Sequence, residues 1–277
     1  MDPGPRYQYM VGPDGPHLVD LWLKTSDVLA SARYSPDVNN NYHLFTRSNR
    51  YTSQPLPLGA DAALRSSHFN ANRKTVFLVH GWNNTPQSDF NVYLVSAYLT
   101  AEDVNLIMVD WSVGAGGTYV SALSNAIRSG EHVARYINWL NTSSGASIAR
   151  YHIIGHSLGG HQAGIISRHL GGRVPYVTAL DPALPGWVTN SEAFMPTDGI
   201  YTEVIHTDAG FSGLVNPAGD VDFYPNGGSG MPGCPDRNCS HHKCIFYMAE
   251  SLLRGGFTGQ RCDSLNSALN GNCNSSG

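Results

Sequence analysis

Charge is scarce in this sequence, and cysteine is missing from most of it. Charged residues make up 14 % of the 277 residues, the net charge is −4, and no run of Lys or Arg occurs. This composition argues against a nucleic-acid partner, because such partners need a basic surface. Long apolar runs are missing too, so no transmembrane segment is expected.

A signal peptide is also lacking. The opening MDPGPRYQYM has neither the positive n-region nor the apolar h-region of one, so the chain is either cytosolic or a mature segment without its leader. All five cysteines lie between residues 234 and 273, at spacings that match no common zinc site. Small disulfide loops are typical of secreted proteins, and N-glycosylation sequons support this, so we expect an extracellular protein. The sequons are Asn83-Asn84-Thr85, Asn141-Thr142-Ser143, Asn238-Cys239-Ser240 and Asn274-Ser275-Ser276.

Short apolar runs alternate with helix-like segments along most of the chain. The runs at 75–82, 105–111, 151–157 and 176–182 predict buried strands, and helices are predicted at 88–100, 119–140, 160–170 and 242–253. This alternation predicts an α/β fold whose mostly parallel sheet is covered on both faces.

The remaining segments complete the predicted organisation. Residues 1–16 are rich in Pro and Gly and predict an irregular N-terminal arm, and residues 53–60 predict a loop. No linker divides residues 17–277, so one catalytic domain is expected there. Further strands are predicted at 17–24 and 40–49, both antiparallel, and at 201–208 and 221–226.

One serine lies between glycines at a predicted strand-to-helix junction. Residues 151–164 read YHIIGHSLGGHQAG, which places Ser157 in a G-x-S-x-G pattern. Glycines at these positions allow a sharp turn that presents the serine oxygen as a nucleophile. The pattern also occurs by chance, so its interpretation depends on finding an acid, a base and an oxyanion hole.

The order serine, acid, histidine is typical of hydrolases with such a turn. Asp181 ends the next predicted strand and is the favoured acid, although an aspartate opening a turn is common there. Asp198 and Asp208 are its rivals. Among the histidines downstream, His241 is favoured because a disulfide at Cys239 could hold it rigidly. The other two are His206, which reads as a core residue of a strand, and His242.

An oxyanion hole needs backbone N–H groups near the nucleophile. Leu158 follows Ser157 directly, and its amide is one candidate. The second is the amide of Trp82 in HGW, where Gly81 gives the chain freedom after a strand. A simple turn at the strand end is the alternative interpretation of HGW.

Several motifs in this order resemble the pancreatic lipase family: VFLVHGW, VDW, IIGHSLGGH, ALDPALPGW, VIHTDAG, DFYPNGG and CSHHK. The resemblance extends from about residue 7 to 273 and implies an α/β-hydrolase fold. It implies Ser157 as nucleophile, Asp181 as acid, His241 as base, and the amides of Trp82 and Leu158 as the oxyanion hole. It further implies a secreted lipase that acts on glycerolipid esters.

The resemblance also implies disulfides Cys234–Cys239 and Cys262–Cys273, which leaves Cys244 as a buried free thiol. The family's lid lies between the first two cysteines, but only PDRN separates them here. So short a loop predicts weak interfacial activation and a phospholipase A1-like preference for phospholipids or galactolipids over triacylglycerols.

Two family features are expected to be missing. Asp198 matches one aspartate of the family's calcium site, but Met195 stands where the other is expected, so we expect neither a metal nor a cofactor. The chain ends near the close of the catalytic domain, so no C-terminal β-sandwich and no colipase-type partner are expected. The alternative function is a catalytically silent lipid-binding or storage protein on the same fold.

Overall fold

A central sheet of eight strands organises the computed structural model, which describes residues 6–12 and 14–273. The strands are β3 (Asn41–Phe45), β4 (Gln54–Pro55), β5 (Thr75–Val79), β6 (Asn105–Asp110), β7 (Tyr151–His156), β8 (Tyr176–Leu180), β9 (Tyr201–Ile205) and β10 (Val221–Phe223). They lie in the order β10-β9-β8-β7-β5-β6-β3-β4. Neighbours are parallel from β10 to β6, whereas β3 and β4 are antiparallel to their neighbours at the other edge.

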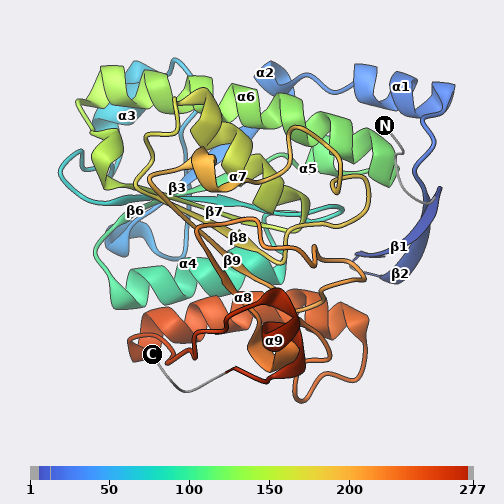
Figure 1. Ribbon diagram of the computed structural model, residues 1–277. Helices are drawn as coiled ribbons and strands as arrows, with labels where there is room; N and C mark the ends of the chain where they lie inside the picture. The colour runs from blue at the N-terminus through green and yellow to red at the C-terminus, as the bar shows by residue number, and fades with distance from the viewer. Residues whose placement is uncertain (1–5, 13, 274–277) are drawn as a thin grey trace.

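Helices cover both faces of this sheet (Figure 1). α4 (Asp89–Ala101) and α8 (Arg237–Arg254) lie on one face, and α6 (Tyr119–Ser144) and α7 (Leu158–His169) lie on the other. The shorter helices are α1 (Thr25–Ala32), α2 (Pro36–Asn39), α3 (Asp61–Ser66), α5 (Ser112–Ala115) and α9 (Leu265–Asn270). The predicted sheet with helices on both faces is therefore confirmed.

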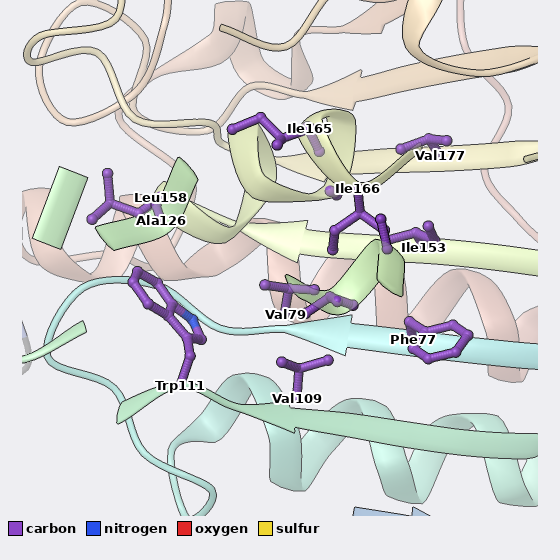
Figure 2. Close-up of a cluster of buried hydrophobic side chains, with 14 of the residues drawn as sticks. Phe77, Val79, Val109, Trp111, Ala126, Ile153, Leu158, Ile165, Ile166 and Val177 are labelled. Atoms are coloured by element: carbon purple, nitrogen blue, oxygen red, sulfur yellow. The ribbon is translucent and has the colours of Figure 1, made fainter. Parts of the chain in front are cut away.

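Strand β5 illustrates why the central strands are apolar throughout. Val76 and Leu78 pack into the core on the α4 and α8 side, whereas Phe77 and Val79 pack into the core on the α6 and α7 side. Figure 2 shows Phe77 and Val79 in the cluster of buried side chains that also contains Ile165 and Ile166 of α7. Successive side chains of a strand point to opposite faces, so burial on both faces requires an unbroken apolar run.

The expectation of an irregular arm at residues 1–16 is wrong for the residues of that segment that the structure describes. β1 (Tyr7–Gly12) pairs antiparallel with β2 (Gly15–Asp20) and forms a separate two-stranded sheet. Gly12 pairs with Gly15, which has a φ of +109°, so these glycines border a hairpin turn and do not interrupt the strands.

Other boundaries also differ from the expectations. The strand expected at 17–24 ends at Asp20, and the helices α1, α2 and α3 were not predicted. The strand expected at 40–49 ends at Phe45, and the loop expected at 53–60 contains the short strand β4. Helix α8 begins at Arg237, because the Asp236 side chain accepts a hydrogen bond from the Cys239 amide at 2.8 Å and caps the helix.

Two further expectations concern membrane-spanning segments and glycosylation sequons. Among the described residues, no helix is both long enough and apolar enough to cross a bilayer. The sequon at Asn274 lies outside the described residues.

Candidate active site

Ser157 occupies a sharp corner between β7 and α7. Its backbone has φ 57° and ψ −120°, a conformation that costs free energy in any residue other than glycine. A Cβ on Gly155 would lie 1.8 Å from the Gly159 carbonyl oxygen, and a Cβ on Gly159 would lie 2.1 Å from the Val79 carbonyl oxygen. Both glycines are therefore required sterically by the turn, and the pattern around Ser157 has a structural cause.

Asp181 follows β8 directly, so it lies at the carboxyl ends of the parallel strands, as Ser157 does after β7. Its Oδ2 accepts a hydrogen bond from Nδ1 of His241 at 2.6 Å. Its Oδ1 accepts the backbone amides of Thr207 at 2.8 Å and Asp208 at 3.0 Å. The carboxylate is thus held at both oxygens, and it orients the imidazole through one ring nitrogen.

The Oγ of Ser157 and the Nε2 of His241 both lack a hydrogen-bond partner among the described residues. Both residues line one small cavity, together with Gly81 and Trp82. The cavity has a volume of about 10 Å³, which is about the space of a single water molecule. An unpaired hydroxyl and an unpaired ring nitrogen thus line the same small cavity.

Of the two candidate oxyanion residues, Trp82 lines this cavity and Leu158 directly follows Ser157. Leu158 is the first residue of α7, a position whose N–H has no partner within the helix. Trp82 lines the cavity, and Gly81 packs so tightly on the serine turn that a Cβ there would lie 3.0 Å from Ser157 Cβ. Glycine at position 81 therefore permits the close approach that brings the Trp82 segment to Ser157.

Burial controls the charges at this site. Desolvation lowers the pKa of His241 well below its usual value, so the ring is neutral at neutral pH and able to accept a proton. Desolvation raises the pKa of Asp181 to about 7, against the opposing effect of the amides of Asp208 and Thr207. The ionised state of Asp181 and the neutral state of His241 therefore coexist as pH rises above about 7.

The rivals of these residues have other partners. Asp198 accepts hydrogen bonds from Arg168 at 2.9 and 3.2 Å. Asp208 accepts the Ser212 amide and pairs with Arg237 at 3.3 Å. His206 bonds to the Leu214 carbonyl and to Asp222, and His242 bonds to the Asn238 carbonyl. Of these four residues, none bonds through its side chain to Asp181 or Ser157.

Helix α8 carries His241 and is fastened at its start. The disulfide Cys234–Cys239 spans the helix N-terminus, and the Cys262–Cys273 disulfide also forms. Behind the ring, His156 Nε2 donates to the His241 carbonyl oxygen at 3.0 Å. Sequence reasoning did not assign this role to His156, although its place next to Ser157 offered a signal. Cys244 is buried with a free thiol, one helical turn beyond His241.

The supposed calcium position contains an ion pair. The Asp198 carboxylate is fully buried and holds the Arg168 guanidinium, while its Oδ2 also accepts the Met195 amide at 2.9 Å. Among the described residues, no group of three or more His, Cys, Asp or Glu side chains is arranged to hold a metal ion.

Two cavity-lining residues were missed because they lie in the supposed arm. Val11 and Gly12, at the end of β1, form part of the wall around Ser157. The loop between Cys234 and Cys239, in contrast, contributes no residue to this wall. The N-terminal hairpin, and not the short loop, therefore supplies part of the wall around Ser157.

The sheet and the serine turn define an α/β hydrolase, and comparison with known proteins specifies its family. The lipase family model matches residues 19–276, and the chain belongs to the pancreatic lipase family. Pancreatic lipase-related protein 2 of Cavia porcellus is 36 % identical over 247 residues, which cover 85 % of this chain and 57 % of that protein.

A second relative agrees on the family. Pancreatic triacylglycerol lipase of Sus scrofa is 34 % identical over 263 residues, covering 84 % of this chain and 58 % of that lipase. The chain thus spans somewhat more than half the length of these relatives. A CIB-like hydrolase from Thermoplasma acidophilum aligns at a TM-score of 0.44 with 16 % identity, over 76 % of this chain and 93 % of that protein.

Proposed function

We propose that this chain is a secreted carboxyl-ester hydrolase that releases fatty acids from glycerolipids. One observation carries the proposal: the unpaired Ser157 Oγ and the unpaired His241 Nε2 line one cavity, while His241 Nδ1 is bonded to Asp181. This is the arrangement that nucleophilic acyl transfer requires. The two disulfides support an extracellular location.

The proposed reaction proceeds through an acyl-enzyme. His241 Nε2 takes the proton of Ser157 as Oγ attacks the acyl carbonyl carbon, and Asp181 stabilises the resulting imidazolium. The amides of Leu158 and Trp82 hold the oxyanion. His241 then gives the proton to the leaving alcohol, and a water molecule, activated by the same ring, releases the fatty acid.

We further propose that phospholipids or galactolipids are better substrates than triacylglycerols. The support is the loop closed by Cys234 and Cys239, which has a sequence separation of 5 and contributes no wall to the cavity. A bulky polar head group therefore meets no long segment at this side of the site.

Two experiments test these proposals. A fluorescent alkyl phosphonate should label the wild type and fail to label Ser157→Ala, and labelling of both at one rate would contradict the assignment. A panel of triacylglycerol, phosphatidylcholine and galactolipid, offered as equally dispersed substrates, tests the preference. A much higher rate on triacylglycerol emulsion would contradict it.

A further inference from the structure

The nucleophile is covered, and the cover includes the N-terminal hairpin. The exposed fractions of Ser157 and His241 are 2 % and 1 %. Their cavity of about 10 Å³ is far below the roughly 300 Å³ or more of sites that enclose a small organic ligand. No acyl chain can reach Ser157 Oγ unless part of the wall moves.

The hairpin is the wall segment least tied to the central sheet. The other lining residues follow β5, end β7 or lie on α8, whereas Val11 and Gly12 belong to the separate sheet of β1 and β2. The Val11 amide donates to Ser212 Oγ at 3.3 Å, and the His17 ring meets the Trp82 ring edge-on at 5.4 Å. Met10 and Val19 also pack into the hydrophobic core, but β1 and β2 pair only with each other and with no strand of the central sheet among the described residues.

The two strands of the hairpin are fastened to each other. Arg6 bonds to both carboxylate oxygens of Asp20 at 2.9 Å, across the open end of the hairpin. Figure 1 shows the pair of strands set apart from the central sheet and connected to α1 by a short segment. The hairpin is thus held together by its own contacts, and residues 21–24 connect it to α1.

The outer face of the hairpin is apolar. Tyr9 and Leu18 are opposite each other in the strand register, with exposed fractions of 62 % and 58 %. Tyr7, Trp22 and Leu23 are exposed beside them, and Asp20 is paired with both Arg6 and Lys24. Aromatic side chains with polar tips favour the boundary between water and lipid, and a paired carboxylate does not repel phosphate groups.

We propose that this outer face docks on a lipid surface and that docking moves the hairpin away from Ser157. The proposal rests on the proposed function, because lipid is then both the docking surface and the substrate. Burying Tyr9 and Leu18 in lipid offsets the free energy of exposing Met10 and Val19, which face the protein core. It also replaces the expectation of weak interfacial activation, which considered only the loop between Cys234 and Cys239.

A docking variant tests the lipid contact. In Tyr9→Ser/Leu18→Ser, binding to phosphatidylcholine vesicles, measured by sedimentation, should weaken about ten-fold or more. The ratio of vesicle hydrolysis to hydrolysis of a monomeric short-chain ester should fall by a similar factor. The matched control is Val38→Ser/Tyr51→Ser, two exposed apolar residues outside the hairpin, which should retain the wild-type affinity and ratio.

A locked variant tests the movement. The Val11 amide donates to Ser212 Oγ at 3.3 Å, so these two positions are chosen for the bridge Val11→Cys/Ser212→Cys, with the bond verified by mass. The oxidised form should react with a hexyl phosphonate at least about ten-fold more slowly than its reduced form. Wild type treated with the same reductant controls for effects on the native disulfides.

The outcomes separate the two proposals. Labelling of the oxidised locked form at the rate of its reduced form would overturn the movement, and unchanged vesicle binding by the docking variant would overturn the lipid contact. If wild type neither hydrolyses esters nor reacts with the phosphonate, the proposed function fails. In that case vesicle sedimentation of the docking variant and its control still decides the lipid contact.

Discussion

Replacing Ser157 should make the protein more stable while it abolishes hydrolysis. The Ser157 hydroxyl is buried without a partner in the protein, and such a group costs about 1–3 kcal/mol. We expect Ser157→Ala to recover about 1 kcal/mol of unfolding free energy, because the hydroxyl still faces a cavity with room for one water molecule. For a chain of this size this corresponds to a rise in Tm of about 2–4 °C.

Ser157→Gly should add a second increment, because it also removes backbone strain. A non-glycine residue at φ 57° and ψ −120° costs about 1–3 kcal/mol, whereas glycine adds about 0.4–1 kcal/mol of unfolded-state entropy. The expected net gain over alanine is about 1 kcal/mol. The expected order of Tm is therefore Ser157→Gly, Ser157→Ala, wild type, from highest to lowest.

The assay pairs thermal unfolding with hydrolysis of a soluble fatty ester. Both variants should lose about 10⁴- to 10⁶-fold in kcat. Ser167→Ala is the matched control, since the Ser167 hydroxyl is also buried without a partner but lies in regular helix α7, away from the cavity. It should gain about 1 kcal/mol and keep full activity. The reasoning is refuted if Ser157→Ala retains more than a few per cent of activity, or if both Ser157 variants melt below wild type.

Three further predictions concern the acid and the helix that carries the base. Because burial raises the pKa of Asp181 to about 7, kcat/KM on a soluble ester should fall as pH drops through 7. The folded state binds that proton more tightly than the unfolded state, so the contribution of Asp181 to stability is full below about pH 4 and is lost as pH rises through 7. A series of Tm measurements against pH would detect or contradict this loss. Gly213→Ala places a Cβ 2.3 Å from Asp181 Oδ1 and should lower kcat about a hundred-fold or more. The control is Gly259→Ala, whose Cβ meets nothing closer than 3.8 Å and which should keep the wild-type kcat. Equal kcat values in the two variants would show that Gly213 is not needed to leave space for Asp181. Replacing Cys234 and Cys239 by serine should lower the unfolding free energy by about 2 kcal/mol and also lower kcat. Removing the Cys262–Cys273 disulfide should leave kcat near that of the wild type. An unchanged kcat in the first variant would show that the position of His241 does not depend on the disulfide.

The central strands could be predicted because their burial is local information. In β5 and β7 every residue is buried, and an unbroken apolar run bounded by turn residues already indicates a strand covered on both faces. The serine turn was equally visible, since the glycines at 155 and 159 are required by contacts within a few residues and with one neighbouring strand.

The N-terminal hairpin was missed for a physical reason. Pro and Gly punctuate both irregular segments and tight turns, and only the pairing of Tyr9 with Leu18 distinguishes the two. That pairing, and the contact of Val11 with Ser212 some 201 residues away, are long-range facts that no local pattern contains.

From sequence alone came the fold class, the family, and the candidate residues Ser157, Asp181 and His241, because each is marked by residue types in a fixed local pattern. Only the tertiary structure decided which nitrogen of His241 meets Asp181, that Asp208 and Asp198 are engaged elsewhere, and that β1 covers the site. These are distances between segments far apart in the chain, and they are set by how the sheet, the helices and the hairpin pack together.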